Sequence, residues 1–129
     1  MNSFTAIDFE TGNPGRVSAC AIGFAVVENS KIVLSDSYLI KPIGGHAPFQ
    51  TKIHGITDEQ TKNKPMFNEI YPQIKKHLNN LVVGHSLFDK QVLLALSDYF
   101  SLNISFQYLD SSTIAKEKIP GLTNYKLTT

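Results

Sequence analysis

The chain has 129 residues, which is the size of one domain and too short for two. Its 12 basic and 11 acidic residues leave a net charge of +1, which argues against a protein that holds duplex DNA by charge alone. A single cysteine, Cys20, excludes an intrachain disulfide and a zinc site built from cysteines. The N-terminus shows no signal peptide or spanning segment, so we expect a cytoplasmic protein without a membrane partner.

Three strands are predicted before any helix. Residues 4–9 form a short apolar run, and residues 19–27 form a second one. A polar turn then leads into residues 32–40, which alternate loosely and indicate the returning strand of a hairpin. Proline and glycine at positions 42, 44, 45 and 48 indicate a loop after this hairpin.

Helices and strands alternate in the second half of the chain. Thr57 and Gln60 have the spacing of a capping box for a short helix. A longer helix is predicted from the helical spacing of Phe67, Ile70, Ile74 and Leu78, and it begins a few residues before Pro72. Strands over 81–84 and 106–109 flank a helix over 86–100, and a short helix is expected over 112–118. This order predicts one α/β domain over residues 1–129 with a mixed five-stranded sheet.

Two carboxylates stand at the end of the first predicted strand. Asp8 and Glu10 are two residues apart, so their side chains point to the same face of the sheet. Adjacent carboxylates repel each other unless a cation lies between them, and oxygen ligands favour Mg²⁺ or Mn²⁺ over zinc. The same pattern also occurs as a solvated rim or a helix cap, and this alternative stays open on local grounds.

A third carboxylate follows the fourth predicted strand. Asp89 lies in the first turn of the helix that Ser86 caps, where the helix dipole alone favours an anion. If the first and fourth strands are neighbours, Asp89 and Asp8 meet at the same edge of the sheet. Three convergent carboxylates are typical of two-metal phosphoryl transfer.

Several motifs, in this order, resemble the DEDD exonucleases, a family that includes the DNA polymerase III epsilon subunit and RNase T. The segment IDFET at residues 7–11 resembles the first motif, and LFD at 87–89 with Leu93 resembles the second. SACAIG at 18–23, IHGIT at 53–57 and NYKL at 124–127 resemble further family segments.

The resemblance implies an RNase H-like fold with the first strand central and helices on both faces of the sheet. It implies removal of nucleotides from a 3′ end with two Mg²⁺ or Mn²⁺ ions held by Asp8, Glu10 and Asp89. It also implies a pocket for the terminal nucleotide, in which Phe88 is equally well explained as a core residue. The matching positions are Phe9, Thr11, Gly12, Ile53, His54 and Phe88.

Two features depart from the family pattern. The asparagine that precedes the second motif is absent, and His85 stands nearby in a segment one residue shorter. The histidine and the aspartate of the third motif would lie beyond Thr129, and no histidine of the chain takes their place. Because a general base contributes about a hundred- to ten-thousandfold in rate, we expect the chain itself to be weakly active or inactive.

Three functions remain open. The first is an exonuclease for the 3′ end of single-stranded DNA, alone or with a DNA polymerase subunit. The second is an exoribonuclease of the RNase T or oligoribonuclease type, and the third is a non-catalytic module that binds nucleic acid. We also expect an uncovered sheet face to favour a homodimer. A nucleotide-binding fold is disfavoured, since the segment GNPG at 12–15 is a poor phosphate loop.

Overall fold

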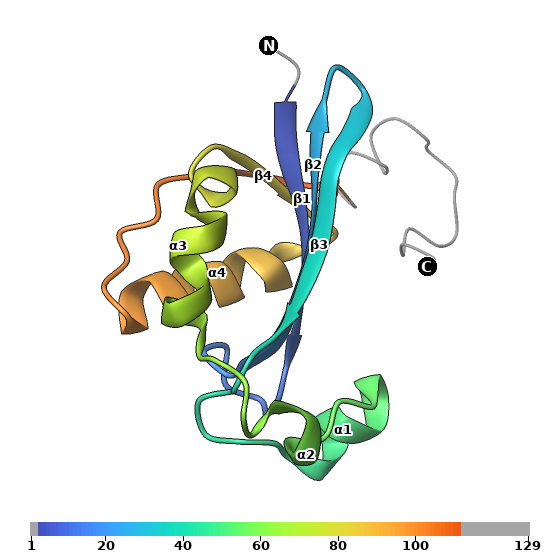
Figure 1. Ribbon diagram of the computed structural model, residues 1–129, viewed down its shortest axis with the longest axis vertical. Helices are drawn as coiled ribbons and strands as arrows, with labels where there is room; N and C mark the ends of the chain where they lie inside the picture. Colours follow the sequence, from blue (N-terminus) through green and yellow to red (C-terminus); the bar gives the residue numbers. More distant parts are fainter. Residues whose placement is uncertain (1–2, 112–129) are drawn as a thin grey trace.

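One long central strand carries the first two carboxylates, and the other strands are arranged around it. The computed structural model describes residues 3–111, and these form a five-stranded sheet in the order β3-β2-β1-β4-β5 (Figure 1). The strands are β1 (Ser3–Thr11), β2 (Ala19–Glu28), β3 (Lys31–Leu39), β4 (Leu81–Gly84) and β5 (Gln107–Asp110). Neighbouring strands from β1 to β3 are antiparallel, whereas β4 runs parallel to β1 and β5 parallel to β4. The predicted mixed sheet with its first strand central is confirmed.

The two neighbours of β1 follow it over very different lengths. β2 pairs with β1 along the whole strand, and this ladder sets Asp8 opposite Gly23 and Glu10 opposite Ala21. β4 pairs with β1 only at Thr5 and Ala6. The two parallel strands therefore separate before Asp8, and the edge of β1 is left without a strand partner beside the carboxylates.

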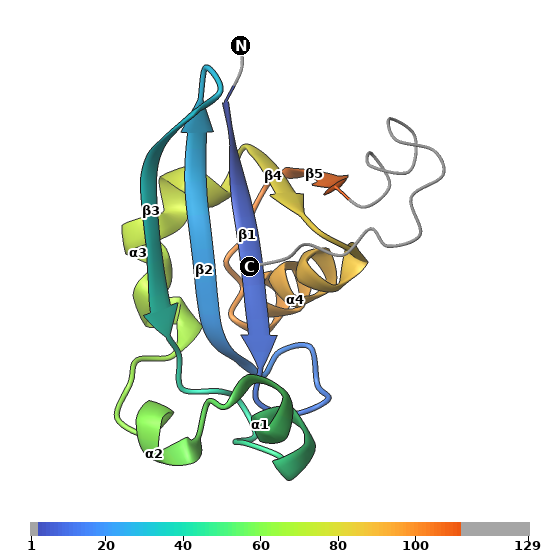
Figure 2. The ribbon, with the colours of Figure 1, turned by 90° about the vertical axis from the view of Figure 1, so that its right-hand side faces the viewer.

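Both long helices described by the structure, α3 (Phe67–Leu78) and α4 (Leu87–Tyr99), lie on the same face of the sheet (Figures 1 and 2). Ile7 and Phe9 of β1 point into the core beneath these helices. Because side chains alternate along a strand, Asp8 and Glu10 point to the opposite face. Within residues 3–111 no long helix covers that second face. The predicted helix over 112–118 and the segment 124–127 lie outside the described residues.

Two short helices, α1 (Pro48–His54) and α2 (Asp58–Thr61), lie beyond the end of β1 (Figure 2). The capping box is confirmed, since Gln60 Oε1 accepts the Thr57 N–H at 2.9 Å. α1 was not predicted, because the proline and glycine residues in the segment before it indicated only a loop. Pro48 in its first turn and Gly55 after its last residue, at φ 76°, are the signals of a helix start and end that the sequence does contain.

None of the helices in residues 3–111 combines the length and the apolar character needed to cross a bilayer.

Candidate active site

Asp8 and Glu10 lie on the face of β1 that no long helix in residues 3–111 covers. Asp8 is exposed and Glu10 is half-buried. Partial burial raises the pKa of the Asp8 carboxyl, and the nearby His85 opposes this rise. Burial also raises the pKa of Glu10, with a further contribution from the negative charge of Asp8, while His54 acts in the opposite direction. The two carboxylates are therefore close enough for the charge of Asp8 to disfavour the ionisation of Glu10.

Asp89 joins these two residues from the start of α4. Its side chain is 4% exposed, and its Oδ1 accepts the peptide N–H of Phe9 at 2.8 Å. The pKa of Asp89 is raised to about 6, chiefly by burial and also by the charges of Asp8 and Glu10, while hydrogen bonds from the backbone of Phe9 and His85 oppose the rise. The predicted convergence of three carboxylates is thus present as an electrostatic coupling.

The register of α4 determines where Asp89 points. The Ser86 side chain caps the helix by accepting the Phe88 N–H at 3.2 Å. The Tyr108 hydroxyl of β5 donates to the Ser86 carbonyl from the other side. A side chain at Gly84 would place its Cβ against that hydroxyl, so glycine is needed for this contact. The shortened segment before the second motif therefore still presents Asp89 to β1.

A pocket of about 230 Å³ opens beside Glu10. It is smaller than the roughly 300–1,000 Å³ of sites for drug-sized ligands, which suits one end of a chain rather than a large molecule. Five of the predicted residues line it, and three further residues complete its wall. The lining residues are Glu10, Thr11, Pro14, Arg16, Gln50, Ile53, His54 and Phe88.

His54 lines this pocket, and both of its ring nitrogens are already engaged. Nε2 is 2.9 Å from the carbonyl oxygen of Thr11, and Nδ1 accepts the Ile56 N–H at 3.0 Å. These contacts select the tautomer that carries its proton on Nε2. His54 therefore fastens the end of α1 to the end of β1, and only its ring edge and carbon atoms are available to a ligand.

The remaining predicted residues differ in how they reach the pocket. Ile53 is 68% exposed and stands at the pocket wall, whereas Phe9 is 1% exposed and packs against Phe67 in the core. The prediction that the Phe9 side chain contacts substrate bases therefore disagrees with its position, because strand alternation turns it away from the carboxylates. Its peptide N–H, which holds Asp89, is its contribution to the site.

Gly12 shapes the turn after β1 through its backbone. Its N–H donates to the Ser18 carbonyl and its own carbonyl accepts the Ala47 N–H, both at 2.7 Å. A Cβ on Gly12 would lie 2.8 Å from the carbonyl oxygen of Gly45, so no larger residue fits without a backbone shift. Gly12 thus ties the loop before α1 to β1, and it is not among the residues that line the pocket.

Several residues near the site were not singled out from the sequence. Arg16 and Gln91 contact each other near Phe88, and Tyr108 and Gly84 support the start of α4. Arg16 is the chain's single arginine, and this alone could have drawn attention to it. No local pattern marks the others, because their roles depend on contacts between distant segments.

The donor set fits divalent metal ions of the Mg²⁺ or Mn²⁺ class in its chemistry. The negative charge of Asp8 helps to raise the pKa of Glu10 and of Asp89, and a cation between the carboxylates would relieve this repulsion. Within residues 3–111, however, no three histidine, cysteine, aspartate or glutamate side chains are gathered as a ligand cage. The residues are close enough to interact electrostatically without forming a complete set of ligands.

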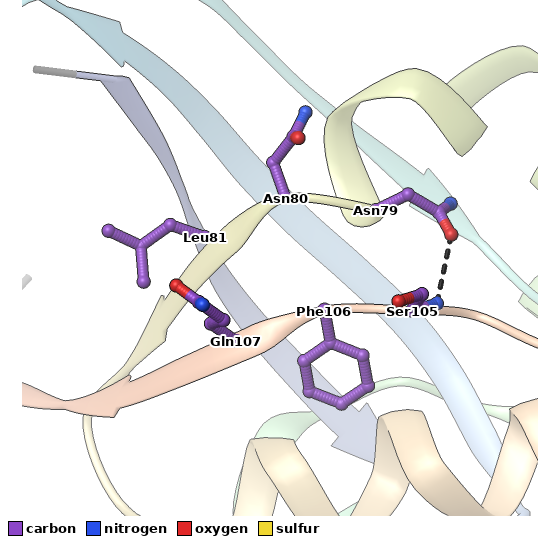
Figure 3. A pocket seen from close by; sticks show the side chains of 6 residues that line it. All are labelled: Asn79, Asn80, Leu81, Ser105, Phe106 and Gln107. Carbon is purple, nitrogen blue, oxygen red and sulfur yellow. Dashed lines mark hydrogen bonds between the residues drawn. The ribbon is translucent and has the colours of Figure 1, made fainter. Parts of the chain in front are cut away.

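A second pocket lies at the opposite end of the parallel strands, where β4 and β5 begin (Figure 3). The Ser105 N–H donates to Asn79 Oδ1 at 2.9 Å across it. Its lining contains no acidic, basic or histidine side chain, so it offers no general acid, general base or charged metal ligand. The lining residues are Asn79, Asn80, Leu81, Ser105, Phe106 and Gln107.

Comparisons with known proteins agree with the geometry. A family model described as Exonuclease, of the RNase T type, matches residues 5–129. The chain is 28% identical over 136 residues to the DNA polymerase III subunit epsilon of Pasteurella multocida, covering 92% of this chain and 52% of that protein. It is 25% identical over 130 residues to the PolC-type DNA polymerase III of Caldanaerobacter subterraneus, covering 98% of this chain and 9% of that protein.

A solved structure of E. coli exonuclease I with a dT13 oligonucleotide superposes with a TM-score of 0.76 at 14% identity, covering 96% of this chain and 32% of that one. This likeness concerns the fold, which is RNase H-like as predicted. The chain spans about half the length of the epsilon subunit and a small part of the PolC-type polymerase. With the family model matched over nearly all of its residues, the chain belongs to the DEDD exonuclease family.

Proposed function

We propose that this domain is a 3′→5′ exonuclease for single-stranded DNA that works with two Mg²⁺ or Mn²⁺ ions. The observation that carries the proposal is the coupling of Asp8, Glu10 and Asp89 at the end of β1. Burial together with like charge raises carboxyl pKa values most often at functional sites. A purely structural site would have little reason to keep three mutually repelling carboxylates together.

The carboxylates would hold the metal ions, and the adjoining pocket would hold the terminal nucleotide. Asp89 is already oriented by the Phe9 N–H, which donates to its Oδ1, so its carboxylate is held next to Asp8 and Glu10 before any ion binds. Bound ions would activate the attacking water and stabilise the leaving oxygen. Divalent metals are used generally in this family, and the choice of Mg²⁺ or Mn²⁺ rests here on the oxygen-only donor set.

The pocket supports a role for a strand end rather than for a duplex. Ile53 of α1 and Phe88 of α4 offer apolar surface to the pocket. Glu10 also lines it, so the pocket adjoins the carboxylate cluster. An aromatic ring such as that of Phe88 can stack on any of the four bases, so such a pocket is tolerant of sequence. The hydrogen bond between His54 Nε2 and the Thr11 carbonyl would hold the part of the pocket wall against which the terminal sugar lies.

An oligonucleotide digestion assay tests this function. A single-stranded DNA labelled at its 5′ end, incubated with the chain and Mn²⁺, is expected to shorten in a ladder that starts from the 3′ end. The matching RNA oligonucleotide distinguishes the deoxyribonuclease from the exoribonuclease alternative. The same assay measures how active the chain of 129 residues is, and weak activity stays our prediction.

Matched variants separate catalysis from folding. Asp8→Asn and Glu10→Gln preserve size and are expected to abolish cleavage, since each removes a charged metal ligand. Asp98→Asn makes the same change on the exposed side of α4 and should leave cleavage intact. DNA binding without cleavage by the unsubstituted chain would instead favour the non-catalytic binding module.

Protein partners are a separate part of the proposal. A polymerase subunit is proposed as a partner because one relative is the epsilon subunit of DNA polymerase III. Another relative is a PolC-type DNA polymerase III, in which the chain matches one short section. A homodimer through the uncovered sheet face is also proposed, because no long helix in residues 3–111 covers this face. Light scattering on the purified chain over a range of concentrations tests the homodimer, and a monomer throughout would refute it.

A further inference from the structure

The single arginine of the chain, Arg16, is fixed in place at the rim of the pocket. Its guanidinium carbon lies 4.9 Å from the centroid of the Phe88 ring. Its Nε donates to Gln91 Oε1 at 3.0 Å, and one terminal nitrogen donates to the Pro14 carbonyl at 3.5 Å. Two of the five N–H donors of the guanidinium are thus used to orient it, and three are left for another partner.

No acid neutralises this cation in the described structure. Within residues 3–111, no carboxylate oxygen lies within salt-bridge distance of Arg16, which is exposed. Of the residues that line the pocket, Arg16 is the one with a permanent positive charge. A fixed, unpaired guanidinium is a ready ligand for an anion with oxygen acceptors.

Because the residues around the pocket are mainly acidic or neutral, binding of a nucleic acid there requires the positive charge of Arg16. The three carboxylates near the pocket repel phosphates until metal ions bind, and the chain as a whole has a net charge of only +1. Attraction of a polyanion therefore depends on local cations. The contact with the Phe88 ring and the hydrogen bond to Gln91 restrict the guanidinium, which lowers the entropy lost when it meets a phosphate.

We propose that Arg16 binds a backbone phosphate of the nucleic-acid strand whose end occupies the pocket. The inference rests on the proposed function and adds a residue that determines how the strand is held. Gln91 and Phe88 act through Arg16 by orienting it. Because the contact is made outside the carboxylate cluster, it exists equally in the bound substrate and in the transition state. Loss of Arg16 therefore raises KM and leaves kcat nearly unchanged.

The salt dependence of binding tests the contact directly. Fluorescently labelled oligodeoxythymidine is titrated with the full chain, with Ca²⁺ in place of Mg²⁺ to prevent cleavage, at salt concentrations between about 50 and 200 mM. Each phosphate contact to a single strand contributes about 0.7 to the slope of log K against log salt. Arg16→Ala is expected to lower the slope by this amount and to weaken binding about tenfold at the lowest salt.

Two variants distinguish charge at this position from charge in general. Arg16→Lys keeps the charge without the planar fork, so the slope is retained while affinity falls. Lys76→Ala removes a cation beside Ser3 at the start of β1, the end opposite to the pocket, and should change neither quantity. Equal slopes for Arg16→Ala and the unsubstituted chain, or an equal loss of slope in Lys76→Ala, would overturn the inference.

The outcomes also separate this inference from the proposed function. Oligonucleotide binding by the unsubstituted chain with an unchanged slope in Arg16→Ala refutes the phosphate contact alone. No binding by the unsubstituted chain refutes the proposed function and the contact with it. Gln91→Ala provides a further check, because it releases the guanidinium without removing its charge. Weaker binding at a retained slope is expected, and unchanged binding would contradict the orienting role of Gln91.

Discussion

The peptide N–H of Phe9 donates to Oδ1 of Asp89 at 2.8 Å, a hydrogen bond between residues 80 positions apart in the sequence. It occurs where β4 has separated from β1, so a side-chain carboxylate takes the place of the missing strand partner. One carboxylate oxygen of Asp89 thus continues the hydrogen bonding of β1. The same interaction places the charge of Asp89 next to Asp8 and Glu10.

The first prediction concerns stability and pH. The pKa of Asp89 is raised by burial from 3.8 to about 6, so the folded state holds this proton more tightly than the unfolded chain. Without metal, the free energy of unfolding should therefore fall as the pH rises from about 4 to about 6, and then level off.

Asp89→Asn removes the buried charge and keeps an acceptor for Phe9. It should be more stable by on the order of 1–2 kcal/mol at neutral pH and inactive. Urea unfolding in EDTA at acidic and neutral pH measures this, with Asp98→Asn as the control.

The second prediction concerns metal binding without any substrate. A cation that binds the carboxylates stabilises the folded state by about 2.7 kcal/mol at a hundredfold excess over its Kd. Mn²⁺ should therefore raise the Tm of the unsubstituted chain above its value in EDTA. Asp8→Asn should lose most of this increase. A metal-induced increase that survives in Asp8→Asn would show that the ion binds elsewhere.

The third prediction concerns the turn after β1. Gly12→Ala forces a Cβ to within 2.8 Å of the Gly45 carbonyl oxygen, and a backbone atom there cannot move away easily. We expect a loss of about 1–3 kcal/mol of stability, measured by urea unfolding. Gly23→Ala is the matched control, since nothing lies within 4 Å of a Cβ at that position of β2. Equal stability of the two variants would contradict the close approach of the loop at Gly12.

The fourth prediction separates the two pocket residues at the end of α1. His54→Ala removes two hydrogen bonds, to Thr11 and from Ile56, and should lower stability by about 1–3 kcal/mol as well as raising KM. Ile53→Ala removes a side chain that is 68% exposed, so stability should hardly change while KM rises. Thermal unfolding and steady-state kinetics on both variants distinguish the roles. An Ile53→Ala variant as unstable as His54→Ala would show that Ile53 also packs α1.

Local patterns predicted most of the elements. The N-cap at Ser86, the strand over 81–84 and the helix with Pro72 near its start all follow from interactions within a few residues, and the structure contains each of them. α1 was the exception, although Pro48 and Gly55 mark its ends. The glycines that precede α1 dominated the pattern and indicated a loop.

By itself the sequence determined the order of the elements and the pairing of Asp8 with Glu10, because a strand brings side chains two residues apart onto one face. Only the tertiary structure decided that Asp89 meets β1, that Phe9 turns into the core and that Arg16 stacks on Phe88. These contacts depend on where β4 leaves β1 and on how α4 is rotated. No spacing along the chain encodes either quantity, since both result from packing between segments far apart in sequence.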